Sequence, residues 1–251
     1  MKNIARRLLR TAITFMMRLR SEPYRLEASS RCLILAPHQD DEAFGCAALI
    51  LTRRKLDLPV NIIYLTDCAG SHPNHPQLSP AKLAVLRRAE ATQAMQGLQV
   101  EATDLKFLDA PDGTLAHLSA PAFEALARQL ATSITAGAPT ELFLPCREDG
   151  SSEHAAAHQI AQRALQLTPL RPRIFEYPIW ARWSSQRLLR PLWTSRVWRL
   201  HSPPSRAQKR AALACYRSQI APTPPWPEAV LPSGFAEVFY SDEEFFFEPC
   251  P

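Results

Sequence analysis

Short apolar runs alternate with helical patterns over the first 180 residues, and this alternation most constrains the fold. The apolar runs predict strands at residues 32–37, 60–67, 104–109, 141–146 and 173–180. The segments between them predict helices at residues 42–55, 81–97, 120–136 and 153–166. Strands that alternate with helices form βαβ units, which build a mainly parallel sheet. The sequence therefore predicts an α/β domain.

Charged and polar side chains follow the predicted strands, at the point where each strand ends. The set includes His38, Asp40, Asp41, Asp112 and His154. In a parallel sheet the carboxyl ends of the strands meet at one edge, and ligands bind in the crevice outside that edge. The sequence therefore predicts a polar cleft there.

His38, Asp41 and His154 form the simplest candidate for a metal site in this cleft. His38 and Asp41 are three residues apart across a tight turn, so both side chains can face one point. Two imidazoles and one carboxylate suit one Zn²⁺ per chain and leave a fourth position for water. Non-haem iron uses the same donors, so Fe²⁺ stays an alternative. A bound ion lowers the pKa of water to about 7, and Asp40, which is not needed as a ligand, can accept the proton.

Several of these residues have a simpler interpretation when each is taken alone. An acidic pair at a helix start, such as Asp40-Asp41, is commonly an N-cap. His158, in the last predicted helix, is either a fourth ligand or oxyanion donor, or a partly exposed helix histidine. His72 and His75 lie in a Pro-rich loop and are expected to face solvent.

The composition is that of an ordinary globular protein, but the charge is unevenly distributed. Hydrophobic residues make up 46% and charged residues 21% of the 251 positions. The formal net charge is +5, and all of this excess comes from the basic residues 1–20. Aromatic residues do not interleave with basic ones and no DNA-binding motif is present, so no nucleic-acid partner is expected. Six cysteines without CxxC pairs fit a reducing compartment and a cytoplasmic protein.

Residues 1–20 combine basic side chains with apolar residues that can line one side of a helix. Two interpretations stay open: a helix that packs on the domain, and an interfacial helix in peripheral contact with an anionic membrane. No stretch reaches the roughly 20 apolar residues that a transmembrane helix needs. The oligomeric state is not predicted by any feature of the sequence.

A series of motifs resembles, in the same order, those of the LmbE-like or PIG-L family of zinc-dependent de-N-acetylases. The motifs are APHQDDEAFGCAALI (36–50), YLTDCAGSH (64–72), RRAEA (87–91), LDAPDGTL (108–115), PCREDGSSEHAAAHQIA (145–161), FEYPIWARW (175–183) and KRAALACYRSQ (209–219). The resemblance covers roughly residues 30 to 220. It implies a Rossmann-like three-layer fold and hydrolysis of the acetamide of an N-acetylated amino sugar or glycoconjugate, either a small molecule or lipid-linked.

The resemblance also implies roles for individual residues. His38, Asp41 and His154 would be the zinc ligands, and Asp40 would be the general base. Four further residues are candidates for substrate binding: Arg87, Asp112, Arg147 and Trp180.

Three positions depart from the family pattern. Gln39 replaces a usual Pro, Cys68 replaces a usual Gly, and Ser151 stands where many members have a His thought to polarise the acetyl carbonyl. Losing one oxyanion donor typically costs about 10²–10³ in rate. Ser151 and His158 are the candidates for oxyanion support. Two alternative functions follow: a metal-binding but catalytically impaired sugar-binding module, and an amidase acting on a non-sugar acyl amide.

We expect three segments along the chain. These are a basic amphipathic N-terminal segment (1–30), the deacetylase-like domain (31–220), and a Pro-rich, acidic C-terminal segment (221–251) that packs on the domain. The prolines after residue 168 suggest an irregular C-terminal third. The acidic, aromatic tail FYSDEEFFFEPCP is expected to be a terminal strand or a cover on the domain.

Overall fold

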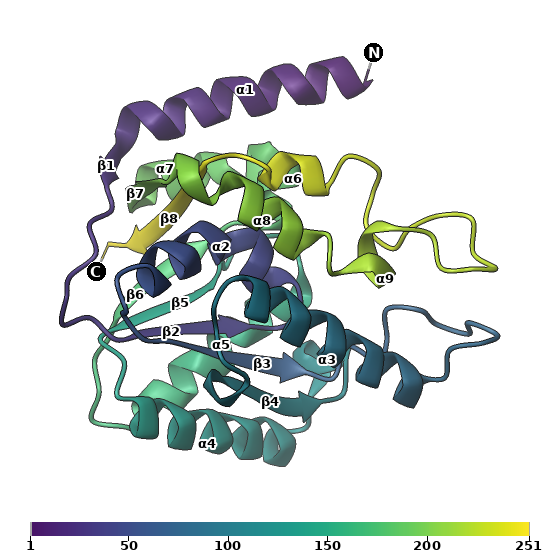
Figure 1. The fold of residues 1–251 in the computed structure, drawn as a ribbon. Helices are drawn as coiled ribbons and strands as arrows, with labels where there is room; N and C mark the ends of the chain where they lie inside the picture. Colours follow the sequence, from purple (N-terminus) through teal and green to yellow (C-terminus); the bar gives the residue numbers. More distant parts are fainter. Residues whose placement is uncertain (1, 251) are drawn as a thin grey trace.

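The computed structural model describes residues 2–250, which form one eight-stranded sheet with helices on both faces (Figure 1). The strands are β1 (Ser21–Pro23), β2 (Cys32–Ala36), β3 (Val60–Thr66), β4 (Leu105–Ala110), β5 (Glu141–Pro145), β6 (Arg173–Tyr177), β7 (Ser195–His201) and β8 (Glu243–Pro249). Their order in the sheet is β1-β7-β8-β6-β5-β2-β3-β4. Only β8 runs antiparallel to its neighbours, β6 and β7.

The five strands expected from the sequence are β2 to β6, and they pair with one another only in parallel. The predicted α/β fold with a mainly parallel sheet is therefore confirmed. Strand β2 pairs with β3 on one side and β5 on the other, so the direction of winding reverses at this strand. Such a switch point opens a crevice at the carboxyl ends of the strands. The loops after β2 and β5 border this crevice.

The helices form the two outer layers of the fold. They are α1 (Lys2–Arg20), α2 (Asp41–Arg54), α3 (Pro80–Gly97), α4 (Ala120–Gly137), α5 (Ser152–Gln166), α6 (Trp180–Trp183), α7 (Leu189–Thr194), α8 (Arg206–Leu213) and α9 (Arg217–Ile220). One core joins β2 and β3 to α2, α3 and α8. The other joins the opposite face of the same strands to α4 and α5. Side chains alternate between faces along a strand, so Ile34 enters the first core, while Leu33 and Leu35 enter the second.

Helix α2 lies unusually close to the sheet, because Gly45 faces the ring of Tyr177 on β6. A Cβ atom at this position would lie 2.3 Å from that ring. The Tyr177 hydroxyl donates to the carbonyl oxygen of Leu35 at 2.8 Å, which connects β6 to β2. Any larger residue at position 45 would move the start of α2, where the polar site residues lie.

The C-terminal third is only partly irregular, as its prolines suggest: residues 221–235 form neither helix nor strand, but regular elements lie on both sides of them. Strands β7 and β8 and helix α8 all follow residue 190. The acidic, aromatic tail forms β8, which inserts between β6 and β7, so it is a strand within the sheet. Phe246 points into the first core, and Phe245 and Phe247 point to the other face. Three consecutive phenylalanines suit a strand that is buried on both faces.

Helix α1 packs against the body of the protein along one side. Ile13 and Met17 are buried in a third apolar cluster with residues of α7, β7 and β8. Packing on the domain was one of the two interpretations left open for this segment. No helix within residues 2–250 combines the length and the apolar character needed to cross a bilayer.

Candidate metal centre

His38 and Asp41 are held together by the tight turn between β2 and α2. The backbone N–H of His38 donates to Asp41 Oδ2 at 3.0 Å, and His38 Nδ1 lies 3.3 Å from the same oxygen. The hydroxyl of Thr66, at the end of β3, donates to the carbonyl oxygen of Pro37 at 2.8 Å. The turn is therefore anchored to the neighbouring strand. Its geometry points one imidazole and one carboxylate to the same place, as the spacing predicted.

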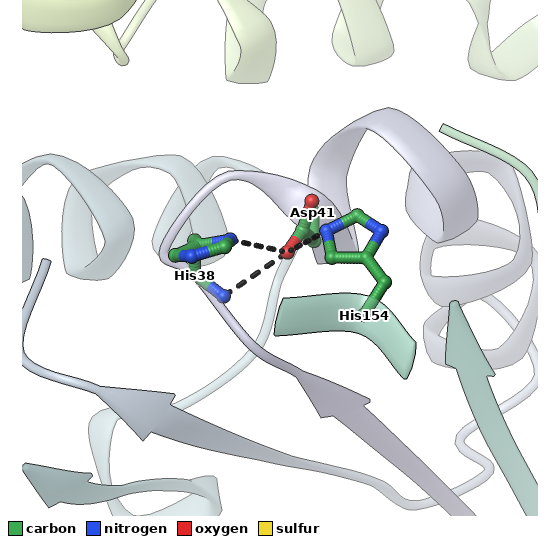
Figure 2. Close-up of side chains that lie close together, drawn as sticks. All are labelled: His38, Asp41 and His154. Carbon is green, nitrogen blue, oxygen red and sulfur yellow. Dashed lines mark hydrogen bonds and ion pairs between the residues drawn. The ribbon is translucent and has the colours of Figure 1, made fainter. Parts of the chain in front are cut away.

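His154 reaches this place from the first turn of α5, so residues 113 positions apart converge (Figure 2). Its Nε2 lies 3.4 Å from Asp41 Oδ2. Ser151 is the N-cap of α5, and its hydroxyl oxygen accepts the backbone N–H of His154 at 3.3 Å. The cap fixes the first turn of the helix and thereby the direction of the His154 side chain.

Asp149 orients the ring of His154 from the opposite side. Its Oδ2 lies 2.7 Å from His154 Nδ1 and also accepts the backbone N–H of Trp180. Its Oδ1 accepts the backbone N–H groups of Ile179 and Ala181 at 2.9 and 2.7 Å. Carboxylate–imidazole pairs of this kind orient metal-binding histidines. This role was not predicted from the sequence, although an Asp in the loop between the strand and the histidine was the available signal.

The donor set fits a divalent metal ion. His38, Asp41 and His154 each offer one ligand atom, and these atoms lie within 4.8 Å of one another. His154 Nε2 is buried and makes no hydrogen bond to any residue that the structure describes, although Asp41 Oδ2 lies 3.4 Å away. A buried polar atom of this kind is costly unless something binds it. An ion with two imidazole and one carboxylate ligand would satisfy it.

The charges around these groups stabilise positive charge at the imidazoles. Burial lowers the pKa of His154, but Asp41 and Asp149 outweigh it and raise the pKa to about 9. Burial likewise lowers the pKa of His38, and Asp112, Asp41 and Glu153 raise it well above its ordinary value. Burial raises the pKa of Asp41, and the two histidines lower it below its ordinary value. Protons and a metal ion therefore compete for the same imidazoles.

Two further carboxylates, those of Asp112 and Glu153, lie on the other side of the His38 ring. His38 Nε2 is 3.4 Å from Asp112 Oδ1 and 3.5 Å from Glu153 Oε2. Both carboxylates also accept backbone N–H groups. Glu153 binds Gly113 and Leu115, and Asp112 binds Gly70. These bonds hold the turn after β4 against the metal-binding loops, and Asp112 lies at the surface of the cleft.

Asp40 lines the same cleft as His38 and Asp41 and pairs with Arg87. The distance from Arg87 Nη2 to Asp40 Oδ2 is 3.1 Å, and Nη2 also donates to the carbonyl oxygen of Gln39. Asp40 occupies the N-cap position of α2, as one interpretation expected, but its side chain makes no capping hydrogen bond. Burial raises the pKa of Asp40 to about 6, although Arg87 opposes this effect. Arg87 is only 1% exposed and holds the carboxylate in place.

The site opens into a cleft of about 330 Å³. Phe44, Trp180 and Phe235 form its apolar side, while Ser71 and Gln219 add polar groups. The size is at the lower end of small-molecule sites, which span about 300–1,000 Å³. The cleft also includes His38, Asp40, Asp41, Arg87 and Asp112 among its lining residues. Neither Arg147, which is exposed, nor Ser151 belongs to the lining in the described part of the chain.

Three histidines differ from what the sequence suggested. His158 is 4% exposed, not partly exposed, and its Nε2 lies 2.7 Å from the carbonyl oxygen of Pro145. His72 and His75 do not face solvent, because both contact Trp226 and bind Thr223. The loop that follows β3 is thus covered by residues from the C-terminal segment. Such a contact between distant segments leaves no local pattern in the sequence.

Two of the departures from the family pattern contact each other. The backbone N–H of Gln39 donates to Cys68 Sγ at 3.2 Å, and Gln39 Nε2 donates to the carbonyl oxygen of Thr66 at 2.9 Å. A proline at position 39 has no N–H to donate. Cys68 has a φ of 54°, in the left-handed region that favours glycine. The Cys68 thiol therefore accepts a hydrogen bond that the family's usual pair, Pro and Gly, cannot form.

Comparisons with known proteins identify a family. The family model of PIG-L, GlcNAc-PI de-N-acetylase, matches residues 33–165. The chain is 34% identical over 85 residues to the probable N-acetyl-α-D-glucosaminyl L-malate deacetylase 2 of Bacillus subtilis (strain 168). That match covers 33% of this chain and spans only 38% of the Bacillus protein.

Two solved structures share the fold at low sequence identity. N,N'-diacetylchitobiose deacetylase from Pyrococcus horikoshii has a TM-score of 0.61 and 16% identity, over 94% of this chain and 82% of that one. GalB, the 4-carboxy-2-hydroxymuconate hydratase from Pseudomonas putida KT2440, has a TM-score of 0.62 and 17% identity, over 75% of this chain and 79% of that one. Their names describe different reactions, so the fold alone does not assign one. The family match covers just over half of the chain and includes all three candidate ligands, and the chain belongs to the PIG-L (GlcNAc-PI de-N-acetylase) family.

Proposed function

We propose that the protein is a metal-dependent N-deacetylase that hydrolyses the acetamide of an N-acetylated amino sugar or glycoconjugate. The convergence of His38, Asp41 and His154 on one point beside the spare carboxylate of Asp40 carries this proposal. The family match supports the reaction class, and the name of the Bacillus relative supports an N-acetylglucosamine-type substrate. The products are acetate and a free amine.

The three candidate ligands would hold one divalent ion, for which Zn²⁺ suits the donor set and Fe²⁺ is the alternative. When bound, the ion polarises the acetyl carbonyl and makes water acidic enough to be a nucleophile near neutral pH. His154 can bind it because Asp149 holds the ring with Nε2 directed at the site. His38 and Asp41 are already fixed by the turn after β2.

Asp40 is the general base in this proposal. Its carboxylate takes a proton from the attacking water while the water oxygen bonds to the acetyl carbon. The C–N bond then breaks, and the same proton passes to the leaving amine. Arg87 keeps the carboxylate oriented and favours its ionised form. This role differs from the sugar contact expected for Arg87, because its guanidinium is buried and already paired with Asp40 and Glu90.

The remaining cleft residues suit a sugar ring. Trp180 and Phe44 offer apolar surface for a sugar face, and Asp112 can accept hydrogen bonds from hydroxyl groups. Lipid-linked and free sugars share this chemistry, and the proposal covers both. Arg147 does not contact the sugar in this proposal, because it is not among the residues that line the cleft in the described part of the chain.

A second candidate function is a metal-dependent sugar-binding module with impaired catalysis. Ser151 favours it, because this residue caps α5 and lies outside the described cleft lining. His158 does not supply the missing donor in this geometry, since its Nε2 is occupied by Pro145. Without an oxyanion donor, any rate enhancement would come only from the metal ion, from Asp40 and from binding of the substrate.

Acetate release from N-acetylglucosamine, its glycosides and non-sugar acetamides separates these possibilities. The wild-type protein, with its metal content measured by elemental analysis, should release acetate from at least one amino sugar. Asp40→Asn should lower the rate by about 10²–10⁴ with the metal content unchanged, because only proton transfer is removed. Asp57→Asn, an exposed position far from the cleft, is the matched control. Metal-loaded protein that binds the sugars but releases no acetate would favour the second candidate, and activity on non-sugar acetamides alone would indicate an amidase.

A further inference from the structure

Exposed apolar side chains gather on α1 and the adjacent α7. Nine large hydrophobic residues are exposed in the described part of the chain, and six of them lie on these two helices. The six are Leu8, Leu9, Phe15, Leu19, Leu189 and Trp193. The other three, Leu56, Val85 and Val230, are far apart in the chain. Single exposed apolar residues are ordinary on protein surfaces, but a gathered set marks an interaction surface.

Helix α1 has two apolar faces, and only one is covered. Ile13 and Met17, one turn apart, are each 1% exposed against the body of the protein. Leu8, Phe15 and Leu19 share the opposite face at helical spacing and are 58–70% exposed. In Figure 1 the helix lies along the outside of the molecule, with one side free of other elements in the described chain. The covered face accounts for the attachment of α1 to the domain, and the outer face makes no contribution to that attachment.

Basic side chains border the outer face. Arg7 and Arg18 are exposed and flank the outer face at helical spacing, and residues 1–20 contain no acidic residue. Arg18 pairs with Glu243, and Arg20 donates to the carbonyl oxygen of Leu192 and lies 4.2 Å from the centroid of the Trp193 ring. These contacts fix the helix on α7 and β8. Helix α1 is therefore held in one orientation, with Leu8, Phe15 and Leu19 directed away from the body of the protein.

We propose that this outer face of α1, together with Trp193, docks on the surface of an anionic lipid bilayer. A helix that presents apolar residues flanked by arginines lies in the membrane interface, where the apolar side chains enter the acyl boundary and the arginines meet lipid phosphates. A second copy of the chain is a poorer occupant, because two such faces would bring their arginines together. The partner is therefore a membrane surface, independently of which sugar the cleft accepts.

Sedimentation of the full-length protein with lipid vesicles tests this proposal. The protein should sediment with vesicles of equal parts phosphatidylcholine and phosphatidylglycerol, much less with phosphatidylcholine alone, and less as salt is raised. The triple variant Leu8→Gln/Phe15→Gln/Leu19→Gln should bind the anionic vesicles at least about tenfold more weakly. These side chains are exposed, so the fold and the hydrolysis of a soluble substrate should not change.

The double variant Leu56→Gln/Val85→Gln is the matched control, because it removes exposed apolar residues away from α1. It should bind vesicles like the wild type. Vesicle binding should also shift the tryptophan emission to shorter wavelength, and Trp193→Phe should remove most of that shift. The proposal is overturned if wild type and triple variant bind anionic vesicles equally. It is also overturned if the wild type binds none, or if it forms a dimer that the triple variant lacks.

Discussion

The first two turns of α5 carry two buried histidines with opposite surroundings. The ring of His154 lies between Asp41 and Asp149, which raise its pKa to about 9 against the effect of burial. His158 lies one turn later, where burial lowers its pKa to about 4 and its Nε2 bonds to a backbone carbonyl oxygen. The first imidazole is prepared to bind a cation, and the second is kept neutral.

The contrast shows that helical spacing places a side chain but does not set its chemistry. Residues four apart share one face of a helix. Both histidines point into the protein, yet only the first lies between two carboxylates, which come from the turn after β2 and the loop after β5. His158 has a single carboxylate nearby, Glu176 at 3.4 Å, whose own pKa burial raises to about 7. His158 meets the end of β5 itself, at Pro145. The four predictions that follow test this contrast, from the largest expected effect to the smallest.

Replacing one histidine at a time should separate their roles most clearly. His154→Gln should abolish stoichiometric metal binding and lower any hydrolytic rate by at least about 10³, because the ion supplies several kcal/mol of transition-state stabilisation. His158→Gln is the same chemical change one turn away and should keep the metal. Elemental analysis and rate measurements check both variants. Equal loss of metal in the two variants would contradict the assignment of His154.

The neutral state of His158 should make stability depend on pH. Its pKa is lowered from 6.5 to about 4, so the unfolded chain binds the extra proton first as pH falls. The contribution of neutral His158 to the free energy of unfolding is fully present above about pH 6.5 and is lost as the pH falls towards 4. The shift between the two pKa values corresponds to about 3 kcal/mol of unfolding free energy.

Urea unfolding of the metal-free protein across this pH range measures the effect. His158→Gln should give a flatter profile than the wild type. The neighbouring Glu176 has its pKa raised to about 7 by burial and titrates with the opposite sign, so it opposes part of the pH dependence that His158 gives. Parallel profiles for the two proteins would mean that His158 does not titrate as described.

Removing the charge beside each ring is a finer test. Asp149→Asn should weaken metal binding by about 10–100-fold, the usual cost of losing a carboxylate that orients a metal-binding histidine. Glu176→Gln makes the same change 3.4 Å from His158 and should leave the metal affinity unaltered. Competition with a chromophoric chelator gives both affinities. A larger effect from Glu176→Gln would reverse the proposed assignment.

The smallest effect is expected at the helix cap. Ser151→Ala should lower the unfolding free energy by about 1 kcal/mol, because the hydroxyl no longer caps α5. Ser119→Ala, at the N-cap of α4, should cost a similar amount. Neither variant should lose metal. A drop in kcat well beyond tenfold for Ser151→Ala alone would instead give its hydroxyl a role in the reaction.

Much of the fold was predictable from local patterns. The strands β2 to β6 and the helices between them follow from apolar runs and helical periodicity, and both patterns extend over a few residues. The three candidate ligands followed from their places after β2 and β5. Strand β7 was missed because arginines and a histidine interrupt its apolar residues (SRVWRLH). The place of β8 between β6 and β7 depends on a pairing across 70 residues of chain.

The sequence by itself determined the α/β alternation, the polar edge of the sheet and the identity of its donors, because these depend on the type and local spacing of residues. Only the tertiary structure decided that Arg87 holds Asp40, that Asp149 orients His154, that His158 is kept neutral and that α1 leaves an apolar face uncovered. Each of these depends on which distant groups approach a side chain, and on how much water they exclude. Packing sets both of these quantities, and no local pattern records them.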